Sequence, residues 1–417
     1  MVDRPARLLP ANSVLLHIGP YKTGTTAIQS ALFAAKPRLK KYGVAYPGRW
    51  RRLVGAGYSV LRWAPPGVAV PAPSVWQHFA EAVRNRGDQR VCVSTEDFGA
   101  LRDESTIRKI VDDLGSDRVQ VIAVARGLHR VLPSHWQERV KSGDPSSYAD
   151  WLGEVLAEQQ QTHAYRTFWA SHDLAATARA WRQVVGADRF RIVVADDSDR
   201  GYLLRVFEQL LGLPAGLLEP DLVGNESLSA TRLEAVRRLN ESVRDRGWPD
   251  DVHRQLIKFG LVRGMQQAPP VDVDHPVRPL PGWARDRVRA LAEQQIAAFD
   301  ELGVEVIGDT DRLRYPEDEP DEDDQPAAGE LVSTETLVQG ALELTAAALR
   351  REEKRASDAT DAALLEQLPT KALLVELSGR IAHRIQAVTG ALRRGPHDQD
   401  LPPDDDDQEP DSRDLGL

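Results

Sequence analysis

The residue types that could do chemistry on an anion gather first between Gly19 and Thr26, in the run GPYKTGTT. A lysine and three threonines surround Gly24 there. The run follows the apolar stretch 14–18, which is typical of a buried strand, and precedes apolar residues at helical spacing (Ile28, Ala31, Leu32 and Ala35). A strand, a glycine turn and a helix N-terminus form an anion site, because the free N–H groups of the first turn point at the ligand and the helix dipole adds positive charge.

This loop differs from the P-loop of nucleotide triphosphatases, G-x-x-x-x-G-K-[ST], at one informative position. Gly19 and Gly24 have the spacing of that motif, but Thr25 occupies the position of its lysine, and Lys22 lies inside the loop instead. From there the Lys22 amine can reach the bridging oxygen and leaving group of a phosphate-like ligand. A conventional ATP or GTP site and a strand–helix turn without a ligand are the alternatives at this point.

Two further strand ends carry polar side chains. Residues 119–125 are almost wholly apolar, as in a parallel strand buried on both faces, and Arg126 follows directly, with Ser134 eight residues later. A guanidinium matches phosphate oxygens bidentately, and a serine hydroxyl early in a helix adds a donor; a surface ion pair is the alternative for Arg126. Residues 90–98 predict another strand, which ends on Ser94, Thr95 and Glu96 where ligands bind in open α/β sheets.

Together these residues resemble the sulfotransferases that use 3′-phosphoadenosine 5′-phosphosulfate (PAPS). The run GPYKTGTTA is similar to their 5′-phosphosulfate loop, particularly in the carbohydrate N-sulfotransferase branch and its bacterial relatives. Arg126 and Ser134 match the arginine and serine that hold the 3′-phosphate in that family, and residues 225–229 (NESLS) are similar to a run in bacterial members. The resemblance extends to about residue 245.

The resemblance implies an α/β fold, a three-layer sandwich with a central, mostly parallel sheet, and PAPS as the sulfate donor without a metal ion. Lys22 would stabilise the leaving group, and Glu96 would be the general base, as a glutamate is in carbohydrate sulfotransferases. Capping of the next helix or pairing with Arg126 is the alternative for Glu96. The residues implied to bind the donor are Gly19, Tyr21, Lys22, Thr23, Gly24, Thr25, Thr26, Arg126 and Ser134.

Other polar residues are expected to be structural. His17, within a buried strand, is a minor rival for the base and is expected to be a core residue; His129 and His135 are expected to be structural more than catalytic. The acidic run 196–199 could be mistaken for a metal site, but carboxylates between a strand and a helix are more often caps.

The composition and the alternation of predicted strands and helices indicate an ordinary soluble core. It has 417 residues, a hydrophobic fraction of 41% and one cysteine, Cys92, which excludes an intramolecular disulfide framework. No apolar run approaches the roughly 18–20 residues of a membrane span, and we expect a cytoplasmic protein. Residues 317–324 hold seven acids and 398–414 hold nine acids and one arginine, so the remainder of the chain is mildly basic despite the net charge of −10. That suits a polyanionic cofactor and argues against nucleic-acid binding by the tails.

The resemblance implies a sulfotransferase domain over 1–315. Beyond it, charge runs and periodicity predict an acidic proline-containing linker over 316–330, a helical extension over 331–395 and a disordered acidic tail over 396–417. Within the first, we expect the helix after the loop to end at Lys36, before Pro37, an irregular excursion over 42–75 and one or two helices over 146–185. The remaining predicted elements are helices at 74–86, 104–114, 201–212, 230–246 and 283–300 and strands at 190–195 and 304–307.

Two other functions stay open from the sequence. One is a P-loop kinase or NTPase, for which Asp97 is the nearest candidate to hold Mg²⁺. The other is a catalytically silent adaptor that keeps the fold and acts through the C-terminal helices, which are also candidates for an oligomerisation arm. The acceptor is not readable, and a carbohydrate, a glycolipid and a small metabolite are all compatible with the sequence.

Overall fold

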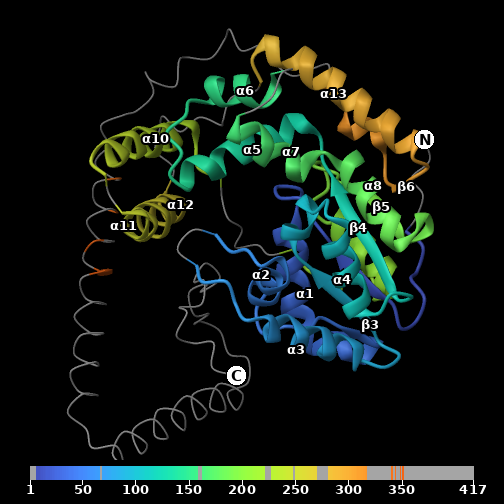
Figure 1. Ribbon diagram of the computed structural model, residues 1–417. Helices are drawn as coiled ribbons and strands as arrows, with labels where there is room; N and C mark the ends of the chain where they lie inside the picture. Colours follow the sequence, from blue (N-terminus) through green and yellow to red (C-terminus); the bar gives the residue numbers. More distant parts are fainter. Residues whose placement is uncertain are drawn as a thin grey trace, which may run out of the picture. The chain divides into compact units, whose positions relative to one another are not determined.

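The computed structural model describes residues 6–65, 68–157, 162–220, 227–247, 249–269 and 280–316, together with residues 340, 343, 348, 350 and 351 (Figure 1). The chain divides into two compact units: residues 1–247 with 270–333, and residues 248–269 with 334–417. The five single residues are helical. The rest of the predicted linker, helical extension and acidic tail lies outside the described residues, except for residue 316. Residues 225 and 226, part of the run 225–229, also lie outside them.

The first unit is built on a six-stranded sheet with the strand order β2-β3-β1-β4-β5-β6. All five strand pairings are parallel, which confirms the predicted α/β class. β1 lies at the centre between β3 and β4, so the loops that leave these three strands meet at one edge of the sheet. The strands are β1 (Val14–His17), β2 (Val44–Ala45), β3 (Arg90–Ser94), β4 (Val119–Ala125), β5 (Phe190–Val194) and β6 (Glu305–Ile307).

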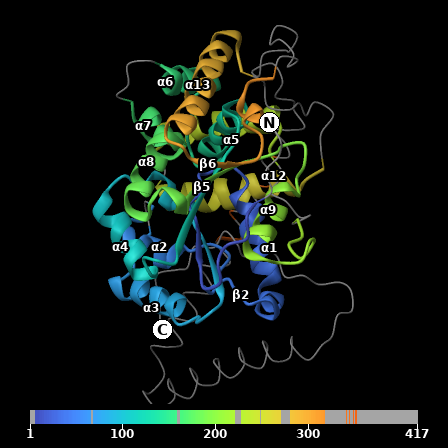
Figure 2. The same cartoon turned by 90° about the vertical axis from the view of Figure 1, so that its right-hand side faces the viewer.

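Helices cover both faces of the sheet, as Figure 2 shows. Alternate side chains of β1 point to opposite faces: Val14 and Leu16 join one apolar cluster, and Leu15 joins the other. The first cluster is closed by α3 (Pro73–Arg84), α4 (Glu104–Leu114) and α8 (Leu174–Val185), and the second by α1 (Thr25–Leu39) and α9 (Tyr202–Leu211). The three-layer sandwich therefore follows from strands that are apolar on both sides.

The described residues of this unit form further helices. They are α2 (Val54–Leu61), α5 (Leu128–Lys141), α6 (Tyr148–Leu156), α7 (His163–His172), α10 (Ala230–Asp245) and α13 (Gly282–Glu301). The N-cap of α10 is Ser229, whose hydroxyl accepts a hydrogen bond from the Arg232 N–H at 3.3 Å. α13 packs on α5, α6 and α8, and leads to β6 at the edge of the sheet.

Three sequence expectations about local structure are wrong. α1 continues through Pro37 to Leu39, because a proline in the last turn costs one hydrogen bond while buried Ala35 and Leu39 keep the helix against the core. The stretch 42–75 is not wholly irregular: it holds β2 and α2, a short helix in which two glycines obscure the helical pattern. Residues 146–185 form three helices, since Asp173 ends α7 and also caps α8 without a glycine or proline to mark the break.

The second unit contains α11 (Asp250–His253), the π-helix Arg254–Val262 and α12 (Arg263–Gln267). Its described residues contact the helical residues beyond 339. Gly340 lies against Leu261 and Met265, and Arg351 pairs with Asp251 at 3.5 Å. These contacts account for the unit's discontinuity in sequence.

Trp181 and Trp283 give a matched test of the core. Trp181 on α8 is fully buried against Phe98, with 6.5 Å between ring centroids, whereas Trp283 on α13 is 54% exposed. We expect Trp181→Ala to lower the free energy of unfolding by about 3–5 kcal/mol, because it removes apolar contact and leaves a cavity. Trp283→Ala should change it by less than about 1 kcal/mol. Urea unfolding followed by circular dichroism measures both; equal losses would contradict the assigned core.

Candidate functional site

The loop between β1 and α1 has an unusual backbone. Gly19, Lys22 and Gly24 have φ values of +85°, +66° and +95°. At Gly19 a Cβ would come within 2.9 Å of the Glu96 Cα, so glycine is required for the loop to pass against the segment after β3. Lys22 is not a glycine, and a positive φ at such a residue costs free energy. Strain of this kind gathers at functional sites and points to a role for Lys22.

The N-terminus of α1 presents backbone donors at this loop. Its N-cap is Gly24, which provides no side-chain cap, and its first turn contains no acidic residue. The N–H groups of the first turn and the positive end of the helix dipole are therefore not neutralised by a cap of this helix. Thr25 is buried and Thr26 is exposed. The Thr23 hydroxyl instead donates to the Pro20 carbonyl at 2.8 Å and closes the loop on itself.

Arg126, at the end of β4, contacts the same loop. Its Nη1 donates to the Lys22 carbonyl at 3.0 Å, and its Nη2 lies 2.6 Å from Asp197 Oδ1. β1 and β4 are neighbours in register, which is why their carboxyl ends bring these two residues together. The structure therefore places Lys22 and Arg126, two residues 104 positions apart, in direct contact.

Lys22 reaches α5 with its side chain. The Lys22 Nζ lies 3.0 Å from Glu138 Oε2, and the two side chains are 27% and 39% exposed. Glu138 stands four residues after Ser134, so both lie on the same side of α5. Ser134 is half-buried in the second turn of that helix. The Lys22 amine therefore reaches the side of α5 that carries Ser134, while Arg126 contacts the backbone of the same loop.

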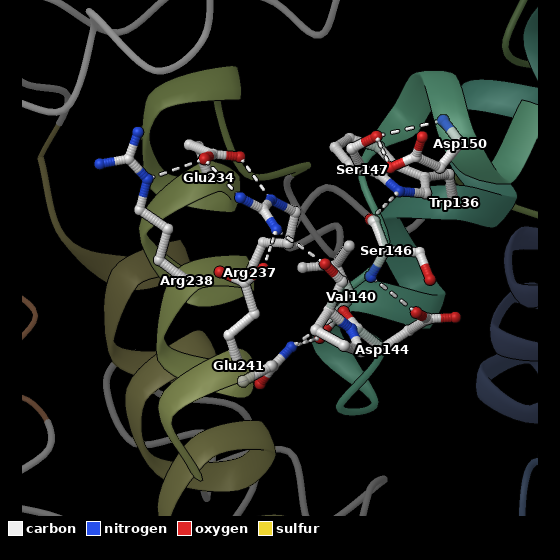
Figure 3. A network of polar contacts seen from close by, with 12 residues as sticks. Trp136, Val140, Asp144, Ser146, Ser147, Asp150, Glu234, Arg237, Arg238 and Glu241 are labelled. Atoms are coloured by element: carbon white, nitrogen blue, oxygen red, sulfur yellow. Dashed lines mark hydrogen bonds and ion pairs between the residues drawn. The ribbon is translucent and has the colours of Figure 1, made fainter. Parts of the chain in front are cut away.

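α10 holds the C-terminal end of α5 in place, as Figure 3 shows. Arg237 is paired with Glu234 at 2.8 Å and donates to the Pro145 carbonyl at 2.7 Å. Asn240 donates to the Val140 carbonyl at 2.7 Å. Since α5 carries Ser134 and Glu138, these bonds from α10 fix the helix on which two candidate site residues lie.

Glu96 lies at the start of the turn after β3 and is 6% exposed. Its Oε2 accepts a hydrogen bond from Gln29 Nε2 at 2.8 Å, and its Oε1 lies 3.4 Å from Arg52 Nη2. The alternative that Glu96 pairs with Arg126 is wrong, because Glu96 instead pairs with Arg52, from the loop before α2. Thr95, not Glu96, caps the following turn, with its hydroxyl accepting from the Asp97 N–H at 3.4 Å.

Tyr21 ties the loop to the residue after Glu96. Its hydroxyl donates to Asp97 Oδ1, and burial together with the carboxylates of Asp97 and Glu96 raises the pKa of Tyr21 well above its usual value. Burial and the Glu96 carboxylate also raise the pKa of Asp97. Arg52 balances these acids: although burial opposes its charge, Glu96 and Asp97 raise the pKa of its guanidinium.

The three histidines singled out in the sequence lie in packed surroundings. His17 is fully buried in β1 against Phe207, with 5.2 Å between ring centroids. His129 packs on Tyr315 at 5.6 Å. His135 stacks on Trp151 at 5.8 Å within the aromatic cluster of α6 and α7. None of these contacts is with the loop at 19–24.

The acidic run after β5 forms turns and ion pairs. Asp196 accepts from the Ser198 N–H at 2.9 Å, and its other oxygen pairs with Arg312 at 2.9 Å. Asp199 accepts from the Gly201 N–H at 2.9 Å. The run therefore caps the turn before α9, whose own N-cap Gly201 has no side-chain bond. Among the described residues, no group of three or more histidine, cysteine, aspartate or glutamate side chains could hold a metal ion.

Four side chains of the site were not predicted from the sequence: Gln29, Arg52, Glu138 and Asp197. Each lies in a different segment, and only the fold brings them to the loop. A signal existed for Glu138 alone, because it stands four residues after Ser134 on a predicted helix. Nothing in the local pattern distinguishes the other three from ordinary polar residues.

Comparison with known proteins adds little beyond the α/β class. The sequence matches no model of a known protein family and no curated protein. Among solved structures the chain is similar to the crystal structure of a sulfotransferase from Alicyclobacillus acidocaldarius: the alignment covers 73% of this chain and 98% of that chain, with a TM-score of 0.41 and 12% sequence identity. A likeness of this degree carries no argument about residues or activity. In the part of the chain that the structure describes, none of the helices is both long and apolar enough to span a membrane.

The burial of His135 predicts a loss of stability in acid. Burial, helped by the charges of Arg139 and Lys22, lowers the pKa of His135 from 6.5 to about 4. The unfolded state therefore binds more protons between these values, and the free energy of unfolding falls as the pH falls from 6.5 towards 4. We expect His135→Phe, which preserves the aromatic packing, to lose about 2 kcal/mol less than the wild type between pH 7 and pH 5.

Urea unfolding at several pH values checks this. The two proteins should have similar stability at pH 8, where the imidazole is neutral in both states. Parallel pH dependence for wild type and variant would contradict the assignment of a buried, neutral His135.

Proposed function

We propose that this chain is a PAPS-dependent sulfotransferase. The observation that carries the proposal is the contact of Arg126 with the Lys22 carbonyl at an uncapped helix N-terminus. Arg126, Lys22 and a set of backbone donors would then share one place at the carboxyl edge of the sheet. A ligand with negative charge at two ends fits this arrangement, since a guanidinium and a helix N-terminus both bind phosphate-like oxygens.

The donor set fits PAPS in its chemistry. The first-turn N–H groups of α1 with Thr25 and Thr26 would hold the 5′-phosphosulfate, and Gly19, Tyr21, Thr23 and Gly24 would shape the loop around it. Arg126 and Ser134 would hold the 3′-phosphate. When bound, PAPS supplies the sulfuryl group, and adenosine 3′,5′-bisphosphate (PAP) is the product that leaves.

In the proposed mechanism Lys22 places its ammonium at the oxygen on which negative charge develops. Transfer of this kind resembles phosphoryl transfer, in which catalysis is mostly positioning and electrostatic stabilisation. To do so, the Lys22 ammonium must leave its ion pair with Glu138 and move to that oxygen. The Arg126 guanidinium must likewise bind the ligand beside Asp197 or leave Asp197 for it. Both carboxylates are partly exposed, so they can turn towards solvent at small cost. Glu96 accepts the proton of the acceptor hydroxyl or amine.

The alternative of a P-loop kinase is less well supported by the site. Asp97, the nearest acid that could hold Mg²⁺, is half-buried and accepts hydrogen bonds from Tyr21 and Thr95. The P-loop lysine position is Thr25, which is buried. A silent adaptor would not need the strained backbone that Lys22 has in this loop.

Calorimetry with PAP and with ATP tests the ligand. We expect PAP to bind with a Kd of about 1 µM or tighter without Mg²⁺, because the N-terminus of α1 and Arg126 would meet its two phosphates. ATP with Mg²⁺ should bind at least roughly tenfold more weakly. The reverse order would contradict the proposal.

Variants of the two cations separate chemistry from binding. We expect Lys22→Ala to lower kcat at least about 100-fold with PAP affinity little changed, because its charge acts on the leaving oxygen. Arg126→Ala should weaken PAP binding by roughly 10–100-fold, as expected for a lost charged hydrogen bond. Radiolabelled PAPS with extracted glycans and metabolites as acceptors gives the rates, and calorimetry gives the affinities.

Matched controls are available on exposed surfaces. Lys109→Ala on α4 removes a surface ion pair with Asp113, and Arg130→Ala removes an exposed arginine of α5. Both should retain transfer and PAP binding. Full turnover in Lys22→Ala would remove that residue from the mechanism.

A further inference from the structure

A buried amide connects the helix of the anion site to the proposed base. Gln29 lies one turn into α1 and is 1% exposed. Its Nε2 donates to Glu96 Oε2 at 2.8 Å and to Ser94 Oγ at 3.2 Å. A carboxylate only accepts, so the atom facing Glu96 must be the amide nitrogen and not its oxygen. The same NH₂ group uses its two hydrogens on two acceptors from one strand end.

Ser94 in turn contacts a buried histidine of β1: its Oγ lies 2.9 Å from His17 Nδ1. A serine oxygen can accept two hydrogen bonds and its hydroxyl can donate one, so this contact forms with either tautomer of His17. Burial lowers the pKa of His17 to about 4, which agrees with a neutral ring at pH 7.

The register of the sheet explains why these groups meet. His17 of β1 is paired with Ser94 of β3, so both side chains point to the face that α1 and α9 cover. Gln29 faces the same strand ends from α1. Unlike Lys22, the chain His17–Ser94–Gln29–Glu96 lies in the interior, where an unmade hydrogen bond is costly and geometry is strongly held.

We propose that Gln29 is a positioning residue that holds Oε2 of Glu96, so that Oε1 is the oxygen that receives the acceptor's proton. The inference rests on the proposed function. Oε1 faces Arg52, whose side chain is 35% exposed, whereas Oε2 faces the buried amide. In the reaction the acceptor's O–H or N–H bond breaks and its proton goes to Oε1. The acceptor atom then bonds to sulfur, and the electron pair of the old S–O bond leaves with PAP.

One helix then serves both halves of the site. The first turn of α1 provides backbone donors for the donor's anion, and the next turn sets the orientation of the base. The charged and titratable groups that face Glu96 each come from a different segment. They are Arg52 in the loop before α2, Tyr21 in the 19–24 loop, Asp97 in the turn after β3, Tyr46 in the segment after β2, and His17 in β1. Oε2 itself accepts from Gln29, a neutral donor.

Gln29→Met tests the inference, since methionine keeps the length and fills the space without the N–H groups. We expect kcat to fall by roughly 10–100-fold, while KM for PAPS and the Kd for PAP change less than about twofold. The acid limb of kcat against pH should move to higher pH, because a carboxylate that loses an N–H donor binds its proton more tightly. Gln29→Leu serves as a second variant if Gln29→Met is poorly folded.

Gln120→Leu is the matched control. Gln120 is a buried glutamine near the amino end of β4, where it accepts from Arg191 at 2.9 Å, at the opposite edge of the sheet. Its loss should lower stability without changing kcat or the pH profile. A purely structural role for Gln29 would give the same result as this control.

A double-mutant cycle gives a readout that does not depend on activity. Gln29→Met and Glu96→Ala, singly and together, should show a coupling of roughly tenfold in the unfolding equilibrium constant. An unchanged kcat in Gln29→Met, or the absence of coupling, would overturn the inference while wild-type transfer continued. A wild-type chain that transfers no sulfate to any acceptor would overturn the proposed function, and the inference with it.

Discussion

The site depends on the hydrogen bond from Arg126 to the carbonyl of Lys22. This bond joins the carboxyl ends of two neighbouring strands, β1 and β4, and holds the loop at 19–24 in a conformation that Lys22 adopts only at a cost. Because the backbone of the loop accepts a hydrogen bond from the guanidinium, the orientation of the Arg126 side chain is set before any ligand arrives. Preorganisation of this kind is what electrostatic catalysis requires.

A second set of bonds organises the other half of the site from the interior. Glu96 is held between a buried amide and a partly exposed guanidinium, and Tyr21 ties the loop to the adjacent Asp97. The buried members are neutral or paired, since an isolated charge in such surroundings would be costly. The proposed donor and base residues therefore share one support, the β1–α1 connection, and a shift of that connection would disturb both.

Charge pairing within the site has a functional consequence. Lys22 is paired with Glu138, and Arg126 with Asp197, so the cations are neutralised by groups that can be displaced. Partly exposed ion pairs contribute little net stability, and an anion that makes several hydrogen bonds at once can replace them. The pair of Glu96 and Arg52 is of a different kind, because the Glu96 carboxylate is buried and only the Arg52 side chain reaches solvent.

The sequence by itself determined the α/β class, most of the helices and strands, and the segments in which Lys22, Glu96 and Arg126 lie. Those features follow from local periodicity and from the rule that ligands bind at the carboxyl ends of parallel strands.

The sequence did not determine that α1 continues past Pro37, or that 146–185 divides into three helices, because tertiary packing of buried faces overrode the local signals. Only the tertiary structure decided the partners: Gln29 and Arg52 for Glu96, Glu138 for Lys22 and Asp197 for Arg126. Such contacts join residues 67, 44, 116 and 71 positions apart, and no local pattern encodes which distant side chain the fold will bring near.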